Sequence, residues 1–258
     1  MIRISEEGKA ESVLNLISEE PLSIRIQGKP YTVIMRTPGD EIAHVAGFCL
    51  GEGLVDSPDD FGTLAYCEGD VNVVTATLIP ERKEKIPELL LRRSYISQTS
   101  CGICGKEMLD DLRQQIPKIG QGSPMDTSLI IASLKVLPAH QPLRDRTRAS
   151  HGAALFSADG EFLASAEDVG RHNALDKVVG KLFLEKKLHT ASLLVLSSRI
   201  SYELVQKAAR AGVPVVAGVS MPTALALDLA LGLDMALVCQ DGANGVFVFC
   251  GHHRLNII

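Results

Sequence analysis

Hydrophobic and polar residues alternate with a period of two near the start of the chain. Residues 22–27 and 31–36 follow this pattern on either side of a Gly28-Lys29 turn, which predicts two strands joined as a hairpin. From Asp40 onward the apolar residues instead recur at helical spacing, which predicts a helix with one buried face; these residues are Ile42, Val45, Ala46, Cys49 and Leu50. Cys49 is therefore expected to pack in the core.

The next part of the chain is more polar. Residues 71–79 alternate as a strand, and the charged residues 81–93 favour a helix. A polar loop is expected over residues 94–100, and a second helix from about Gly105. Two glycines and two prolines fall within residues 117–124, so we expect the domain boundary there. This divides the chain into an α+β domain, residues 1–120, and a second domain, residues 121–258.

The second half alternates between short apolar runs and amphipathic segments. A hairpin is expected over residues 153–165, and a helix from about Arg171. Buried strands are expected at 192–196, 213–219, 235–239 and 246–250, and helices at 201–211 and 222–231. Strand–helix alternation of this kind predicts an α/β sheet with helices on its faces.

Composition narrows the class of protein. The 258 residues are 46% hydrophobic and carry a formal charge of -5, which argues against general nucleic-acid binding. The most apolar stretch, residues 222–238, is interrupted by Asp228 and Asp234, so no membrane span is expected. The N-terminus has no secretory pattern. We therefore expect a cytoplasmic protein whose six cysteines are reduced.

Two of those cysteines stand out. Cys101 and Cys104 have Cys-x-x-Cys spacing, follow a polar loop and precede a predicted helix, with Lys106 close by. A helix N-terminus and a nearby cation both favour thiolate over thiol. The pair therefore has the features of a nucleophile, and a sulfur-carrying role fits best.

Other interpretations of this pair stay open. A structural zinc site needs four ligands, and the pair supplies two, so no bound metal is expected. A thioredoxin-like redox pair would follow a strand near the chain start rather than a polar loop. Simple packing fits poorly among Ser, Thr, Gln and Gly.

Polar residues in the second half suggest an anion site. Arg144, Arg146 and Arg148 could bind phosphate from a loop, or could simply be solvated. His151 opens a strand, and Arg171 and His172 open a helix, positions that are common in α/β sites although His172 could equally be a buried structural histidine. The turns at 197–201 and 220–223 could hold anions or only cap helices, with Ser201 a natural N-cap.

The chain resembles the formate dehydrogenase accessory sulfurtransferase family, also known as the FdhD/NarQ family. The matching stretches are Ser100-Cys101-Gly102-Ile103-Cys104-Gly105-Lys106, His151-Gly152-Ala153-Ala154-Leu155, EDVGRHNALDK at 167–177, SSRISYELVQKAARAGVPVVAG at 197–218, and 222–230. The resemblance covers most of the chain and is strongest from Cys101 onward.

This resemblance implies a function. Such proteins carry sulfur from a cysteine desulfurase to the molybdenum cofactor that formate dehydrogenase needs, with the persulfide at the position of Cys101 and with Cys104 as the second site cysteine. It also implies a homodimer, and a second domain similar in fold to cytidine deaminases. The cofactor, a bis-molybdopterin guanine dinucleotide, would be bound as cargo.

The resemblance also implies where the cofactor binds. A C-terminal loop is the expected place, here Gln240, Asp241, Gly242, Ala243, Asn244 and Gly245, together with His151, Arg171 and His172. The chain departs from the family pattern at two points. Arg148-Ala149-Ser150 replaces Thr-Gly-Gly, and Gly245 stands where the loop usually has arginine.

We therefore expect a sulfurtransferase whose Cys101 thiolate receives the outer sulfur of a donor persulfide. A non-catalytic chaperone that only holds the cofactor is the alternative. A zinc hydrolase of deaminase type is a third interpretation, and the sequence lacks its His-x-Glu and Pro-Cys-x-x-Cys pattern.

Overall fold

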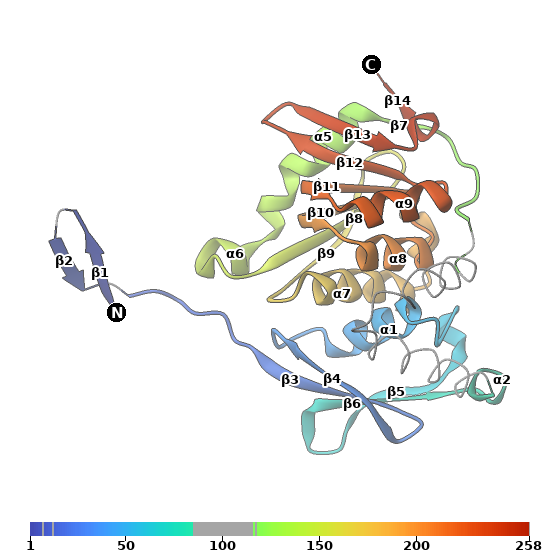
Figure 1. The fold of residues 1–258 in the computed structure, drawn as a ribbon. Helices are drawn as coiled ribbons and strands as arrows, with labels where there is room; N and C mark the ends of the chain where they lie inside the picture. The colour runs from blue at the N-terminus through green and yellow to red at the C-terminus, as the bar shows by residue number, and fades with distance from the viewer. Residues whose placement is uncertain (7, 12, 85–115, 117, 258) are drawn as a thin grey trace, which may run out of the picture.

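The computed structural model describes residues 1–6, 8–11, 13–84, 116 and 118–257. Its largest element is a six-stranded sheet with the strand order β13-β12-β11-β10-β8-β9 (Figure 1). The strands of this sheet are β8 (His151–Phe156), β9 (Phe162–Asp168), β10 (Leu193–Ile200), β11 (Val215–Pro222), β12 (Ala236–Asp241) and β13 (Gly245–Cys250).

The three central strands of this sheet are parallel. β10 pairs with β11 and β11 with β12, whereas β8, β9 and β13 join the sheet antiparallel to their neighbours. The helices α7 (Arg171–Leu184), α8 (Tyr202–Arg210) and α9 (Ala224–Gly232) come directly before or after these strands. Short connections bring the carboxyl ends of β10, β11 and β12 to one edge of the sheet.

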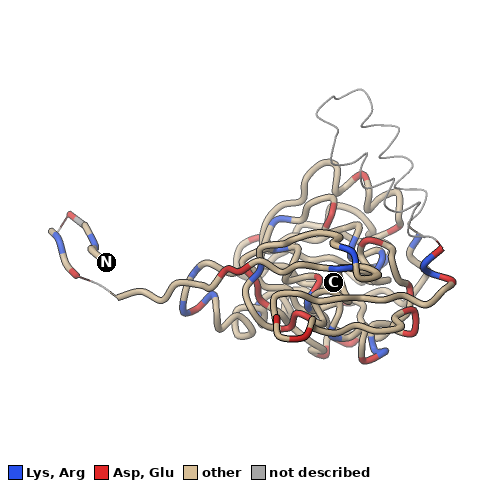
Figure 2. The backbone as a smooth tube through the Cα atoms, turned by 90° about the horizontal axis from the view of Figure 1, so that it is seen from below, with Lys and Arg blue, Asp and Glu red and all other residues tan. Residues whose placement is uncertain are grey.

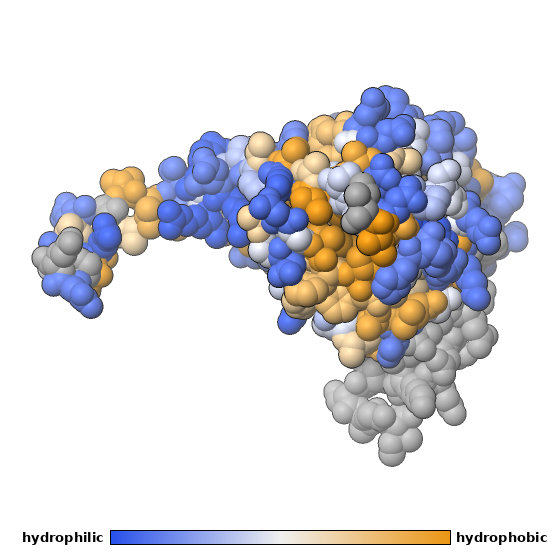
Figure 3. All heavy atoms as spheres, turned by 90° about the horizontal axis from the view of Figure 1, so that it is seen from above, coloured by the Kyte–Doolittle hydropathy of each residue, from blue (hydrophilic) through white to orange (hydrophobic). Residues whose placement is uncertain are grey.

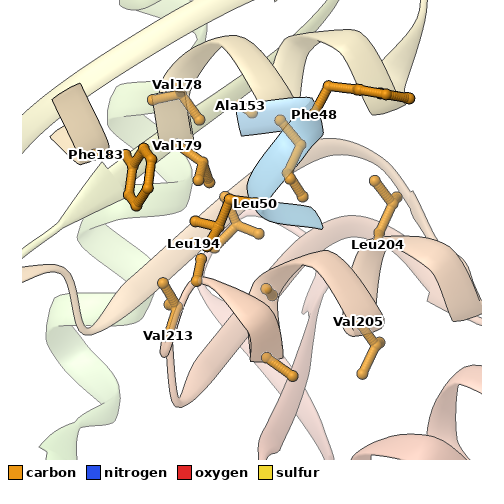
Figure 4. Close-up of a cluster of buried hydrophobic side chains, with 14 of the residues drawn as sticks. Phe48, Leu50, Ala153, Val178, Val179, Phe183, Leu194, Leu204, Val205 and Val213 are labelled. Atoms are coloured by element: carbon orange, nitrogen blue, oxygen red, sulfur yellow. The ribbon is translucent and has the colours of Figure 1, made fainter. Parts of the chain in front are cut away.

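Alternate residues of the strands enter two separate cores, as the strand period requires. Leu194 and Leu196 of β10 face α7 and α8, whereas Leu193 and Val195 face α5 (Thr127–Val136) on the opposite side. The larger core is drawn in Figure 4, which labels Phe48, Leu50, Ala153, Val178, Val179, Phe183, Leu194, Leu204, Val205 and Val213.

The first part of the chain forms a second, four-stranded sheet. Its order is β4-β3-β6-β5, with β3 and β6 parallel and the outer pairs antiparallel. The strands are β3 (Glu20–Ile26), β4 (Lys29–Arg36), β5 (Phe61–Cys67) and β6 (Asp70–Leu78). One face packs on α1 (Glu41–Gly51), because Leu22, Ile24 and Val74 are fully buried there.

Helices α1 and α7 pack unusually closely and join the two sheets. A Cβ atom at Gly47 would lie 1.9 Å from the carbonyl oxygen of Asp176, and one at Gly180 would lie 1.8 Å from that of Ala43. Only glycine permits this approach of one helix backbone to the other. The larger core therefore runs continuously from the four-stranded sheet to the six-stranded sheet.

The N-terminal residues extend away from the rest of the protein. β1 (Ile2–Ser5) and β2 (Gly8–Glu11) pair only with each other, and Figures 1 and 2 show this hairpin projecting from the body.

The remaining elements are small: α2 (Pro80–Lys83), α6 (Pro142–Thr147), the paired strands β7 (Met125–Asp126) and β14 (Leu255–Asn256), and the 3-10 helices η1 (Pro58–Asp60), η2 (Leu137–His140), η3 (Leu188–Thr190) and η4 (His252–Arg254).

The expected mixture of sheets and helices is confirmed, as are all of the elements predicted between residues 151 and 250. The hairpin at 22–36 and the helix after Asp40 are also confirmed, and Cys49 is fully buried in the core. The strand β5 and the helix α5 were not predicted. The division at residue 120 stays a prediction, because residues 85–115 lie outside the described part of the chain.

The segment with three arginines was predicted to be a loop, and that prediction is wrong. Residues 142–147 form helix α6 instead. The carboxylate of Glu167 stabilises its first turn by accepting hydrogen bonds from the N–H groups of Leu143 at 2.7 Å and Arg144 at 2.8 Å. Proline at the first helical position is also favourable. Glu167 follows far later in the sequence, so no local pattern could reveal this cap.

Candidate functional site

The candidate site lies at the edge of the six-stranded sheet where β10, β11 and β12 end. Ligands of open α/β sheets commonly bind outside the carboxyl ends of the strands. β8 runs antiparallel to β10, so its first residue, His151, reaches the same edge, where it pairs with Asp168 at the end of β9. The N–H of Gly152 donates to Oγ of Ser197 on β10 at 2.8 Å.

Two helices begin beside His151. Helix α7 starts with Arg171 and His172, and helix α8 starts with Tyr202 and Glu203. Nε2 of His172 lies 2.8 Å from Oε2 of Glu203, so the two helix starts are joined by an ion pair when the imidazole is protonated. The structure thus brings together the three sequence-predicted residues His151, Arg171 and His172 and adds Glu203, which the sequence analysis missed.

The charges at this edge affect one another. Burial lowers the pKa of His151, and the nearby charges of Arg171, Arg144 and His172 lower it further. His151 is therefore a neutral imidazole at neutral pH. The hydrogen bond from His172 lowers the pKa of Glu203, which stays a carboxylate. The edge thus combines a neutral histidine, an arginine and a histidine–carboxylate pair.

Several polar atoms here have no hydrogen-bond partner among the described residues. They are Nδ1 of His151, Nε of Arg171 and Oγ of Ser201, and all three atoms are buried. Ser201 does occupy the predicted N-cap position of α8, but its hydroxyl makes no cap hydrogen bond, and α7 has no side-chain cap either. The N-termini of two helices, with their free N–H groups, therefore face the edge together with unpaired donors. This arrangement suits an anion such as a phosphate.

The predicted cofactor loop is the turn between β12 and β13, at the same edge. Its residues are Gln240, Asp241, Gly242, Ala243, Asn244 and Gly245. Within it, Nε2 of Gln240 donates to the carbonyl oxygen of Gly242 at 2.9 Å, and Nζ of Lys135 donates to Oδ1 of Asn244 at 2.8 Å. Three strand spacings separate β12 from β8, a distance of about 14 Å. The turn and the histidines therefore do not form one compact pocket.

The three arginines of α6 do not act as one cluster. Arg144 donates from Nη1 to the carbonyl oxygen of Ser150 at 3.2 Å, and Arg146 donates from Nε to that of Pro142 at 3.3 Å. Arg148 ends the helix with φ 58°. Of the three, Arg144 is the one whose charge acts on His151. A phosphate-binding role for the other two stays a prediction without a structural reason behind it.

The buried residues of the segment 167–177 serve the fold instead. Nζ of Lys177 lies 2.8 Å from Oδ2 of Asp168, and both side chains are at most 2% exposed. Asn173 donates from Nδ2 to Oδ1 of Asp168 at 2.8 Å, and Lys177 donates to the carbonyl oxygen of Thr37 at 2.7 Å. This network ties α7 to the chain that follows β4. Asn173 and Lys177 fall within the apolar face of the helix predicted from Arg171. These two polar residues were the sequence signal for this buried network.

A cavity of about 420 Å³ lies close by, between β9, α7 and the residues that follow β4. Its charged lining residues already have partners. Lys181 pairs with Asp40 at 2.8 Å, and Glu167 accepts from Oγ of Ser150 at 2.6 Å. The cavity therefore lacks the unpaired donors that mark the carboxyl edge.

Cys101 and Cys104 lie outside the described residues. Of the cysteines that are described, Cys49, Cys239 and Cys250 are buried, and burial raises the pKa of each thiol. A thiol with a raised pKa is a poor nucleophile. Within the described part of the chain, no three side chains are grouped as a metal site would require, and no helix has the length and apolar character to cross a membrane.

The fold and the site define the class as a mixed α/β protein with unpaired polar atoms at the carboxyl edge of its main sheet. Residues 17–256 match the model of the FdhD/NarQ family, and the chain belongs to that family. A curated relative from Streptomyces avermitilis, named sulfur carrier protein FdhD, is 38% identical over 99% of this chain and 94% of its own length. Relatives of the same name from Streptomyces coelicolor and Mycobacterium tuberculosis are each 41% identical; they cover 85% and 80% of this chain, and 81% and 78% of their own lengths.

The fold also matches a solved structure. A putative formate dehydrogenase accessory protein from Desulfotalea psychrophila aligns with a TM-score of 0.78. The alignment covers 99% of this chain and 97% of the other, at 22% sequence identity. At that identity the likeness shows the fold.

Proposed function

We propose that the protein is a sulfur carrier that receives sulfur from a cysteine desulfurase and delivers it to the molybdenum cofactor of formate dehydrogenase. The curated relatives named sulfur carrier protein FdhD support this function, because they match nearly the whole chain. The protein acts in the cytoplasm. Its second domain, residues 121–258, has a fold of cytidine deaminase type, and two copies of the chain form the active particle.

Sulfur loading is a thiol exchange at Cys101. The thiolate of Cys101 attacks the outer sulfur of the donor's persulfide, a new S–S bond forms, and the donor's own S–S bond breaks. The donor leaves as a thiolate, so the step needs no external oxidant or reductant. Cys104 must be held away from the resulting persulfide or act as a relay, because its thiolate could otherwise attack Cys101 and release sulfide.

The carboxyl edge of the six-stranded sheet holds the cofactor as cargo. The unpaired polar atoms of His151, Arg171 and Ser201 beside two helix N-termini are the observation that carries this part of the proposal. Phosphate oxygens of a guanine dinucleotide would accept hydrogen bonds there. Gln240–Gly245, about 14 Å along the same edge, lies within reach of another part of so long a ligand.

Intact-mass spectrometry after incubation with a cysteine desulfurase and cysteine tests the loading step. The wild-type chain should gain the mass of one sulfur atom, and Cys104→Ser should still do so. Cys101→Ser should gain none. A Cys101→Ser chain that loads sulfur normally, with the persulfide mapped to Cys104, would contradict the assignment. Indifference to both substitutions in formate dehydrogenase activation would favour a chaperone that only holds the cofactor.

A further inference from the structure

The outward face of the four-stranded sheet is not covered by any described element. Figure 1 shows α1 on the other face, and Figure 2 views the molecule from the side of this sheet. Because Leu22, Ile24 and Ile26 are buried against α1, the alternate residues Pro21, Ser23 and Arg25 of β3 point outward. The register then fixes which residues of the other strands join them.

Two apolar rows cross this face. Val33 of β4 pairs with Ser23, and Ser23 pairs with Val73 of β6. In the neighbouring row Met35 pairs with Pro21. The outward side chains stay open to solvent: Val33 is 62% exposed, Met35 49% and Val71 67%. Exposed apolar side chains on an open sheet face, here interrupted by Ser23, favour a contact site.

The rest of the face carries hydroxyl groups and little charge. Thr63 and Thr77 share a hydrogen bond between their hydroxyls, and Thr75 pairs with Arg25. Arg25, near the carboxyl end of β3, is a charged residue that points outward. Its Nε is buried and has no hydrogen-bond partner in the described structure. A partner that brings a carboxylate to the guanidinium group of Arg25 would pair with its charge.

The ends of the sheet differ in charge. Glu19 and Asp70 lie at the end where β3 and β6 begin, and Glu68 lies in the turn just before β6. On the side of β3 and β4, Arg25 and Lys29 lie at the opposite end, where β3 finishes and β4 begins; Asp59 and Asp60 lie at that end on the side of β5. A second copy turned by half a rotation would place its acidic end over the basic end of the first. Around β3 the face is thus complementary in charge to itself, as a twofold contact requires.

The size of the face and the N-terminal arm agree with such a contact. Four strands span about 19 Å and the seven residues of β3 span about 23 Å, so two packed faces cover about 870 Å², the size of a weak or transient interface. The arm leaves the sheet at Glu20, next to Pro21, and exposes Val13 at 94% and Leu16 at 88%. A two-stranded hairpin such as β1–β2 is only marginally stable alone and would gain from packing on the second copy.

We propose that this face is the contact surface between two copies of the chain, stacked with their strands antiparallel so that Arg25 of one copy meets the acidic end around Asp70 of the other. Sheets packed in this way lie about 10 Å apart with their strands nearly aligned. This inference rests on the proposed function, in which two copies of the chain act together, and it identifies the surface where they meet. It concerns assembly alone, and sulfur loading by a monomeric variant would leave it untouched.

The test is the dissociation constant of the dimer, measured on the full chain by sedimentation velocity over a range of concentrations. Val33→Asp should raise it at least about tenfold, since a charge replaces an exposed apolar side chain at the centre of the contact. Leu231→Asp on α9 is the matched control, because Leu231 is 60% exposed, and it should leave the constant unchanged. Figure 3 shows that exposed hydrophobic residues also gather on the side of the molecule that carries β13 and the C-terminus.

A charge exchange tests the antiparallel arrangement without touching the apolar rows. Arg25→Glu and Asp70→Arg should each weaken the dimer about tenfold, and the double variant should recover most of the loss. Thermal unfolding checks that each variant is folded; if Val33→Asp is not, the charge exchange alone decides. A wild-type chain that stays monomeric, a dimer lost in Leu231→Asp but kept in Val33→Asp, or a double variant that is not rescued would each overturn the proposal.

Discussion

The α1–α7 interface and the carboxyl edge of the six-stranded sheet use residues of the same segment, 167–177, in opposite ways. At the interface Asp168 and Lys177 are buried and fully paired. At the edge the neighbouring Arg171 keeps a buried Nε without a described partner. An unpaired buried donor costs about 1–3 kcal/mol. Asp168 and Lys177 are thus matched within the chain and serve the fold, whereas the guanidinium of Arg171 keeps a donor that a ligand could use.

Breaking the buried ion pair should produce the largest effect. Lys177→Met leaves the carboxylate of Asp168 buried without its cation, and we expect the free energy of unfolding to fall by about 3–5 kcal/mol. Urea denaturation measures the loss. Lys187→Met removes an exposed pair with Glu185, whose side chains are 65% and 54% exposed, and should cost less than about 1 kcal/mol. If both variants lost the same free energy of unfolding, burial would not determine how much an ion pair contributes to stability.

The close approach of the two helices should be almost as sensitive. Gly180→Ala places a Cβ atom 1.8 Å from the carbonyl oxygen of Ala43, and a backbone atom cannot move aside cheaply. We expect a loss of about 3 kcal/mol in the free energy of unfolding. Gly232→Ala is the control, because a Cβ atom there meets nothing within 4 Å. The interface would be looser than described if both substitutions were tolerated equally.

At the carboxyl edge, substitution should affect binding rather than stability. Arg171→Ala removes an unpaired donor, so guanosine diphosphate binding measured by calorimetry should weaken by about 10- to 100-fold, in keeping with about 1.5–3 kcal/mol for a charged hydrogen bond. The free energy of unfolding should not fall, because the substitution also removes a buried donor that has no described partner. Arg146→Ala should leave the affinity unchanged. The reverse outcome would move the phosphate site to α6.

The interface should also show its own pH dependence. Burial, with the charges of Lys177, Lys207 and Arg36, lowers the pKa of His44 to about 3. Between about pH 6.5 and 3 the unfolded chain binds a proton at this histidine that the folded chain does not. Neutral His44 therefore makes its full contribution to the free energy of unfolding above about pH 6.5. This contribution is lost as the pH falls, by up to about 1.4 kcal/mol per pH unit.

Comparing the slopes of unfolding free energy against pH isolates this contribution. His44→Leu should flatten the slope between pH 6.5 and 4.5, whereas substitution of the exposed His189 by Asn should not. An unchanged slope in His44→Leu would show that His44 is not the group responsible.

Much of this architecture could be predicted from the sequence because its signals are local. The elements from β8 to β13 follow apolar runs with clear turns between them. Helix α5 also had such a signal, since Ile130, Ser133, Leu134 and Leu137 recur at helical spacing and are buried. β5 was harder to predict, because Gly62 interrupts its short alternation and its pairing partner lies on β6.

The site could be predicted only in part, because only some of its residues are marked by local signals. His151, Arg171 and His172 stand at element ends that the sequence marks, so their meeting at one edge follows from the order of the strands. Glu203 could not be predicted, because its role depends on the start of α8 lying beside the start of α7. The pairing of Asp168 with Thr37 depends likewise on packing between distant parts of the chain.

Activation of formate dehydrogenase tests most directly whether sulfur loading and cofactor delivery use two different parts of the chain. Wild-type, Cys101→Ser and Arg171→Ala chains would each be expressed in cells that lack their own copy, with sulfur loading followed by mass on the same samples. We expect Arg171→Ala to load sulfur like the wild type yet leave formate dehydrogenase at less than about a tenth of its activity, in line with the loss of a charged hydrogen bond. Cys101→Ser should neither load nor activate. Full activation by Arg171→Ala would contradict the account.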